Sequence, residues 1–269
     1  MTLPTFTLRQ LVEAGAHFGH HARRWNPQMA PYIYGKKDNV HIINLQKTYP
    51  MLYTALNAAR EVAANGGKIL FVATKKQAQE VVKENALRCG QFYVNYRWLG
   101  GMLTNWKTVH KSINRLVKLN SMFENNEVEG YTKKEIQNLK KEQEKLALSL
   151  NGIMNMGGQP DMIFVIDTPK EALAIKEAKK LGIPVIGIVD TNANPNDVDY
   201  PVPGNDDAIR AISLYCELMS AAIIDGMQAE IAAQGVRLEE AADQAEAKPA
   251  PKKRASKKAV KEEQTEVAE

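Results

Sequence analysis

Cysteine is scarce in this chain: only Cys89 and Cys216 occur among 269 residues, and no C-x-x-C pair is present. A disulfide scaffold and a zinc module built on cysteines are therefore excluded. Hydrophobic runs are short, and none approaches the roughly 18–20 residues that a membrane-spanning helix needs. The first residues also lack the basic and apolar regions of a secretion signal. We expect a reduced, soluble, cytoplasmic protein that does not associate with membranes.

Motifs of nucleotide-binding and hydrolytic enzymes are missing as well. The chain contains no G-x-x-x-x-G-K-S/T, G-x-G-x-x-G, G-x-S-x-G or H-E-x-x-H pattern. Nothing around Cys89 marks it as a nucleophile, so we interpret it as a small apolar residue near a helix end. We therefore predict no catalysis and no cofactor. The alternative is an enzyme whose small ligand lies among residues at the predicted strand ends, namely Lys75, Lys76, Asp167 and Asp190.

Charge is unevenly distributed, although the formal net charge is only +4. Residues 1–65 carry a balance of +4 and residues 66–160 a balance of +7. Residues 161–240 carry −8, and residues 241–269 carry +1. A basic first part followed by an acidic region indicates one face for a polyanion. The alternative interpretation is an accident of surface composition.

Short apolar runs that follow turn signals read as buried strands, and helical patterns separate them. Strand, helix and strand joined by short links predict an α/β protein with a parallel sheet covered by helices. The predicted strands are Lys68–Ala73, Asp161–Ile166 and Ile183–Val189, with weaker candidates at Val40–Ile43 and Phe92–Val94.

Helix start and stop signals accompany these strands. Thr74 is positioned to cap the next helix, and Thr168 with Glu171 has the spacing of a capping box. Gly182 is expected to end the helix that begins there. The predicted helices cover residues 48–64, 77–87 and 207–225, together with the stretch that ends at Leu181.

Residues 104–155 depart from this alternation, because their pattern is helical throughout with one break in the middle. Apolar residues spaced three and four apart in both halves predict an antiparallel coiled-coil hairpin. Thr132 and Glu135 form a capping box at the start of the second helix. Asn120 and Gln143 interrupt the apolar stripes, and they either fix the register or lie near solvent.

The domain organisation follows from these changes in pattern. We predict an α/β globular domain over residues 1–103 and 156–240, with the hairpin 104–155 inserted in it. Residues 241–269 contain no aromatic residue and cannot bury enough apolar surface to fold, which predicts a disordered charged tail. The lysines of this tail either contact RNA or are simply solvated.

Two groups of basic residues favour RNA binding. The first mixes cations with aromatic side chains in a predicted loop, which suits phosphate contact and base stacking. Its members are Arg23, Arg24, Trp25, Tyr32, Tyr34, Lys36 and Lys37.

The second group lies on the first helix of the predicted hairpin, just after Arg97-Trp98. Spacings of four, four and three place its members in one stripe that can follow a phosphate backbone. No acidic residue occurs between positions 104 and 123, so the alternative of an ordinary solvated face is less favoured. The stripe consists of Lys107, Lys111, Arg115 and Lys118.

Three histidines, His17, His20 and His21, lie within five positions of one another. Imidazole and carboxylate together suit several divalent metal ions. The spacing matches no strong metal motif, so packing and hydrogen bonding is the favoured interpretation and we assign no metal ligand. The carboxylates that could complete a site are Asp190, Asp197, Asp199, Asp206 and Asp207.

Seven stretches of the chain carry a family resemblance. They are Leu11–His20, Arg24–Pro27, Met29–Tyr34, Phe71–Ala78, Arg97–Asn105, Pro160-Asp161 and Gly187–Asn192. In order and spacing, from about residue 5 to residue 230, they resemble the bacterial small-subunit ribosomal proteins of the S-two family. The tail after residue 241 contributes no match.

The resemblance implies a non-catalytic structural protein of the small ribosomal subunit that acts in translation. It implies a flavodoxin-like parallel sheet with a protruding coiled-coil hairpin. It also implies contact with small-subunit ribosomal RNA and other small-subunit ribosomal proteins, help in recruiting the S-one family protein, and no homo-oligomer. The regions that could serve RNA contain Arg23, Arg24, Lys36, Lys37, Lys75, Lys76, Arg97, Lys107, Lys111, Arg115 and Lys118. A protein-only adaptor that docks through the hairpin remains the alternative.

Overall fold

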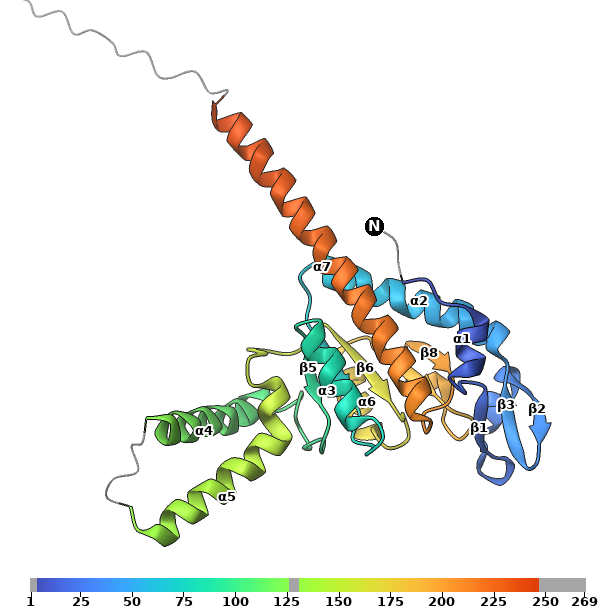
Figure 1. Cartoon of the computed structure of the whole chain (residues 1–269), viewed down its shortest axis with the longest axis horizontal. Coiled ribbons are helices and arrows are strands. Elements are labelled where there is room, and N and C mark those ends of the chain that lie inside the picture. Colours follow the sequence, from blue (N-terminus) through green and yellow to red (C-terminus); the bar gives the residue numbers. More distant parts are fainter. Residues whose placement is uncertain (1–3, 126–130, 247–269) are drawn as a thin grey trace, which may run out of the picture. The chain divides into compact units, whose positions relative to one another are not determined.

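The computed structural model describes residues 4–125 and 131–246, with side chains described as far as Ile231. The chain divides into two units, Met1–Ile231 and Ala232–Glu269. The described part of the second unit, residues 232–246, is helical. The first unit contains two sheets, and its elements are labelled in Figure 1. Within the described residues, no helix is both long and apolar enough to cross a membrane.

The larger sheet has five strands, all parallel, in the order β5-β4-β6-β7-β8. Counted along the chain this is the order 2-1-3-4-5 of flavodoxin-like folds. The first four strands confirm the sequence predictions, whereas β8 was not predicted because two prolines interrupt it. Proline is tolerated on an edge strand, which is where β8 lies. The bounds are β4 Ile69–Val72, β5 Phe92–Val94, β6 Met162–Ile166, β7 Val185–Val189 and β8 Tyr200–Pro203.

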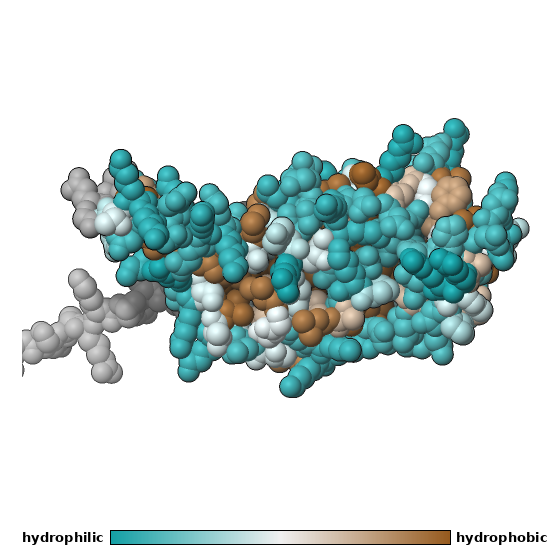
Figure 2. Space-filling view, turned by 90° about the horizontal axis from the view of Figure 1, so that it is seen from below, coloured by the Kyte–Doolittle hydropathy of each residue, from teal (hydrophilic) through white to brown (hydrophobic). Residues whose placement is uncertain are grey.

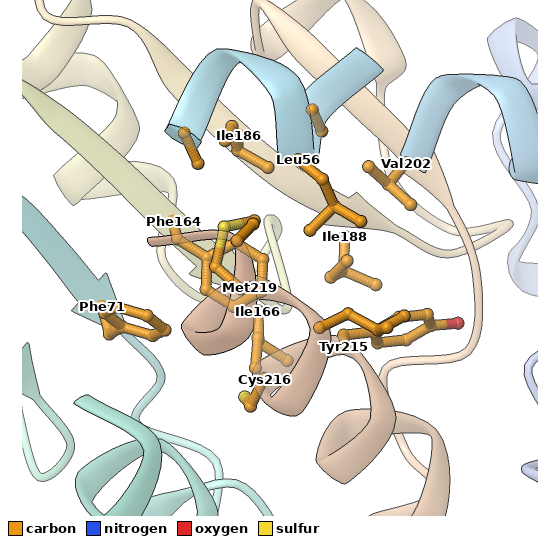
Figure 3. Close-up of a cluster of buried hydrophobic side chains, with 14 of the residues drawn as sticks. Leu56, Phe71, Phe164, Ile166, Ile186, Ile188, Val202, Tyr215, Cys216 and Met219 are labelled. Carbon is orange, nitrogen blue, oxygen red and sulfur yellow. The ribbon is translucent and has the colours of Figure 1, made fainter. Parts of the chain in front are cut away.

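Helices cover both faces of this sheet, because alternate residues of its buried strands face opposite sides. Phe71 of β4 belongs to the cluster that packs on α2, α3 and α7, and it meets Phe164 edge-to-face at 5.4 Å (Figure 3). Val72 belongs to the second cluster, which also contains residues from α6, from the first part of α4 and from the C-terminal end of α5. The bounds are α2 Leu45–Ala64, α3 Gln79–Arg88, α4 Trp106–Glu124, α5 Lys133–Leu150, α6 Ala172–Leu181 and α7 Ile209–Glu246.

Two predicted helix caps are wrong, for one physical reason. α6 begins at Ala172, and the Glu171 carboxylate accepts hydrogen bonds from Thr74 N at 2.9 Å and from the Thr74 hydroxyl instead of closing a box with Thr168. Thr74 therefore does not cap α3 either. Both polar side chains serve a tertiary link between the ends of β4 and β6. Gly182 does end α6, with a φ of 71°.

Helices α4 and α5 occupy the predicted hairpin region, and the capping box of Thr132 and Glu135 is confirmed. The side-chain oxygen Oδ1 of Asn120 accepts a hydrogen bond from the side-chain amide of Gln143 at 2.8 Å, so the two polar interruptions face each other. One side of α4, which carries Val109, Ile113, Leu116 and Leu119, is buried. The structure thus contains two paired helices, and their coiled-coil geometry stays a prediction.

A three-stranded antiparallel sheet, in the order β1-β3-β2, precedes the parallel sheet in the chain. Strand β3 confirms the weaker strand candidate at Val40–Ile43, whereas the prediction of a loop where β2 lies is wrong. Asp38 and Asn39 both have positive φ, 49° and 62°, and form the two-residue turn that closes a hairpin. The elements here are α1 Leu8–Glu13, β1 Phe18–His21, η1 Ala22–Arg24, η2 Pro27–Tyr32, β2 Ile33–Lys37 and β3 Val40–Ile43.

Helix α7 extends well past the predicted end at residue 225. Residues 241–246, expected in the tail, are helical, and the rest of the predicted tail lies outside the described residues. Two short 3-10 helices, η3 Asn151–Ile153 and η4 Pro195–Asp197, complete the elements of the described residues. On the face shown in Figure 2, hydrophilic residues predominate and hydrophobic ones form small patches, as is normal for protein surfaces.

Candidate nucleic-acid interface

A basic hollow of about 620 Å³ lies on the antiparallel sheet. It is lined by His21 at the end of β1, Arg23 in η1, Lys36 in β2 and Asn39 in the turn. The pairing of β1 and β2 with the central β3 brings these positions together. Neither Arg23 nor Lys36 has an ion-pair partner among the described residues. The hollow can therefore accept an anionic group such as a phosphate.

Exposed aromatic rings lie on the same part of the chain. Tyr34 is 79% exposed and Trp25 is 41% exposed. Trp25 is stacked on His41, with 5.6 Å between ring centroids and 29° between planes. Arg24 and Lys37 are exposed nearby in sequence but do not line the hollow. Exposed rings on the same segment as exposed cations suit stacking on unpaired bases.

The basic stripe on α4 is exposed along its whole length, opposite the buried side of the helix. Lys107, Lys111 and Lys118 have no ion-pair partner among the described residues. Arg115 instead makes a bidentate ion pair with Glu142 of α5, at 3.0 and 2.9 Å. The sequence has no signal for this pair, because the absence of acidic residues between positions 104 and 123 says nothing about α5.

Arg97 is exposed, and the loop that follows it is held by one buried carboxylate, that of Glu177 in α6. Burial acts to raise the pKa of Glu177, but the donors around it outweigh burial and lower the pKa. The sequence does not single out Glu177, because its partners lie more than seventy residues away. The donors are Trp98 Nε1, Gly101 N, Leu103 N, Thr104 N and Thr104 Oγ1, at 2.8 to 3.2 Å.

Lys75 and Lys76, adjacent in sequence, are in different surroundings. The Lys75 ammonium lies 2.6 Å from Asp207, 2.9 Å from Asp206 and 3.4 Å from Asp167. Burial acts to lower the pKa of Lys75, but these three carboxylates outweigh it and raise the pKa. Lys76 is exposed. The strand ends where an enzyme ligand was considered thus hold an internal ion-pair network.

One histidine joins this network. His20 Nδ1 lies 2.7 Å from Asp190, and His20 Nε2 lies 3.6 Å from Asp207. The ligand atoms of His20, Asp190, Asp206 and Asp207 all lie within 4.8 Å of one another. Burial, followed by repulsion from Asp190 and Asp167, raises the pKa of Asp206 to about 7. The other residues considered for a metal do not join this group, namely His17, His21, Asp197 and Asp199.

Comparison with known proteins gives a consistent result. A sequence model of the family described as "Ribosomal protein S2" matches residues 11–226. The small ribosomal subunit protein uS2 of Rhodospirillum rubrum is 62% identical over 236 residues, covering 88% of this chain and 90% of the relative. The uS2 proteins of Rhodospirillum centenum and Gluconobacter oxydans are 59% and 60% identical, covering 88% and 87% of this chain and 91% and 88% of theirs.

These matches define the class: an α/β ribosomal protein that is a structural, non-enzymatic component of the translation machinery. Within this class, the chain belongs to the ribosomal protein S2 family. The prediction of no catalysis is confirmed by this membership. It also agrees with strand ends at which Lys75 and its carboxylates bind one another.

Proposed function

We propose that the chain is a structural constituent of the small ribosomal subunit that binds small-subunit ribosomal RNA. The observation that carries the proposal is the exposure of unpaired cations on two surfaces, the hollow with Arg23 and Lys36 and the three lysines of the α4 stripe. Such cations neutralise phosphates and release counterions, which makes affinity fall as salt rises. The other cations proposed for RNA contact are Arg24, Lys37, Lys76 and Arg97, all exposed.

Two of the predicted RNA-binding residues are expected to contribute less to RNA binding, because they are already paired within the protein. Lys75 already contacts three carboxylates, so its main role is to hold the strand ends together. Arg115 shares its guanidinium with Glu142, so it reaches a phosphate only in competition with that carboxylate. We expect Lys107, Lys111 and Lys118 to dominate on this helix.

The proposal extends to organisation and partners. Residues 104–155 act as an inserted module that carries the cationic stripe away from the α/β domain formed by residues 1–103 and 156–240. Most of the acidic segment 161–240 faces away from RNA, toward solvent or toward other ribosomal proteins that include the S-one family protein. The chain acts as a single copy on ribosomes in the cytoplasm. Family membership and the separation of charge along the chain support these assignments.

Density-gradient sedimentation tests the proposal. A tagged full-length chain in cell lysate is expected to migrate with small subunits and to lose that position after ribonuclease treatment, because RNA contacts hold it there. Slow migration of the free protein in both samples would contradict a stable ribosomal role. Rapid migration that survives nuclease would instead support the protein-only adaptor.

The cluster of His20, Asp190, Asp206 and Asp207 favours a second candidate role, the binding of one divalent cation. Asp206 is fully buried, and its Oδ2 has no hydrogen-bond partner among the described residues. One imidazole with carboxylates suits borderline divalent ions such as Zn²⁺ or Mn²⁺. The competing interpretation is that Lys75 and a protonated His20 compensate these charges without a metal ion.

Metal analysis of dialysed, full-length protein separates the two interpretations. We expect about one ion per chain if the cluster is a metal site, and a loss of most of it in Asp206→Asn, since a buried ligand is removed. Circular dichroism of the variant checks that the fold is retained. A wild-type chain that holds no ion after dialysis would contradict the metal site and leave the charges to be compensated by Lys75 and His20.

A further inference from the structure

A pocket of about 270 Å³ lies at the carboxyl ends of β6 and β7, beside the first turn of α6. Thr168 follows β6, Asn192 follows β7, Ile175 and Lys176 belong to α6, and Asn26 comes from the N-terminal region. In parallel sheets, ligands bind at this end of the strands. None of the residues predicted to bind RNA lines this pocket.

Two residues that line the pocket have an unsatisfied polar atom. Thr168 Oγ1 and Asn192 Oδ1 are buried and have no hydrogen-bond partner among the described residues. The whole Thr168 residue is 4% exposed. A buried polar group without a partner is destabilising, and in native proteins water or a ligand usually supplies the partner. When either side chain turns toward a ligand in the pocket, that ligand would supply the missing hydrogen bond.

The charges around the pocket suit a ligand with an anionic group and a polar edge. Lys176 has no ion-pair partner among the described residues. Ala172, which also lines the pocket, is the first residue of α6, and the N-terminus of a helix is the positive end of its dipole. One acidic residue lines the pocket, Asp197, and its carboxylate accepts a hydrogen bond from the Asn194 amide at 3.2 Å.

We propose that this pocket holds one unpaired nucleotide of the RNA that the protein binds, with its phosphate near Lys176. The proposal rests on the proposed function for its RNA source. The volume lies just under the roughly 300–1,000 Å³ of pockets for drug-sized ligands, so it suits a single base. Ile175 offers an apolar contact for a base face, while the amides and the hydroxyl match the donors and acceptors of a base edge.

The carboxylate at the rim fits the same ligand. Asp197 would accept a hydrogen bond from an exocyclic amino group, which adenine, guanine and cytosine carry and uracil lacks. A free mononucleotide has the same chemistry as a nucleotide within RNA. The two sources are therefore separated by experiment.

The first experiment titrates the full-length protein with the four nucleoside 5′-monophosphates and follows NMR signals. We expect shifts at Thr168, Ile175 and Asn192, with UMP the weakest ligand. Lys176→Ala should weaken binding by roughly two- to fivefold, the usual size of one exposed charge pair. Lys180→Ala, on the same helix but outside the pocket lining, should leave affinity unchanged. Absence of shifts at these three residues would overturn the pocket.

The second experiment irradiates small subunits from cells that carry the tagged chain and sequences the crosslinked peptides. A nucleotide attached within residues 168–179 or 192–197 is the expected product. Monophosphate binding without such a crosslink would overturn RNA as the source and point to a free mononucleotide. Subunits that contain the chain without pocket binding refute this proposal alone, whereas a chain absent from subunits refutes the proposed function.

Discussion

Glu177→Gln is expected to lower the free energy of unfolding by about 2–4 kcal/mol, because an amide cannot accept all the hydrogen bonds that the carboxylate accepts. Oε1 accepts from Trp98 Nε1 and Gly101 N, and Oε2 accepts from Leu103 N and both polar groups of Thr104. The new amino group would point at two or three of these donors. Each donor left unpaired in the buried loop costs about 1–3 kcal/mol.

The measurement is urea unfolding of the full-length chain at neutral pH, with Glu84→Gln as the matched control. The control makes the same chemical change at Glu84, an exposed position of α3. The control should shift the unfolding free energy by less than about 0.5 kcal/mol. An unfolding curve of Glu177→Gln that overlays that of Glu84→Gln would contradict the structural role assigned to Glu177.

The pH dependence gives a second check on Glu177. Its pKa in the folded protein is lowered below the ordinary value of 4.5. The stabilisation is therefore fully present above pH 4.5 and is lost as pH falls through the lowered pKa. The difference between wild type and Glu177→Gln should thus be largest at neutral pH and shrink below about pH 4.5. RNA binding should weaken too, since the same loop carries Arg97 and leads into α4.

Replacing Lys107, Lys111 and Lys118 together with alanine is expected to lower the salt slope of RNA binding by about 2, since each lost phosphate contact removes roughly 0.7–0.9. Affinity should fall by about tenfold or more, at up to about 1 kcal/mol for each exposed contact. Filter binding to small-subunit ribosomal RNA over a series of KCl concentrations measures both quantities.

A charge-matched control separates a specific stripe from general charge. Lys170, Lys180 and Arg210 are exposed cations of the acidic segment, and their triple replacement removes the same charge. We expect the control to change the salt slope by much less than the α4 variant does. Equal slopes in the two triple variants would show that the α4 stripe has no special place in the interface.

The ion pair between Arg115 and Glu142 allows a test in which a substitution is expected to strengthen RNA binding. Glu142→Gln removes a carboxylate that competes with phosphate for the Arg115 guanidinium. RNA binding should therefore become tighter, by an amount near the worth of one exposed ion pair. Unchanged binding would place Arg115 outside the RNA contact.

Much of the parallel sheet could be predicted because its signals are local. The central strands are buried on both faces and therefore read as continuous apolar runs, as Met162–Ile166 and Val185–Val189 do. The cap formed by Thr132 and Glu135 involves neighbours in the chain, so it was also predicted correctly. The paired helices followed from apolar residues spaced three and four apart, a period that a helix imposes directly.

Two failures have a different origin, because in each of them the deciding partner is distant in the chain. Glu171 has the right spacing for a cap, but the Thr74 backbone N–H and hydroxyl offer it buried hydrogen bonds instead. The prolines of β8 argue against a strand until the sheet places it at an edge. The β2–β3 hairpin is a different case, because it depends on a local turn in which two non-glycine residues, Asp38 and Asn39, adopt positive φ.

By itself, the sequence determined the first four strands of the parallel sheet, the helical pair, the family and the set of cations. The tertiary structure alone decided which cations are free. Lys75 and Lys76 are neighbours in sequence, yet one contacts three carboxylates and the other is exposed. The physical reason is that an ion pair acts through space over a few ångströms, so a charge in the sequence has no assigned partner until folding supplies one.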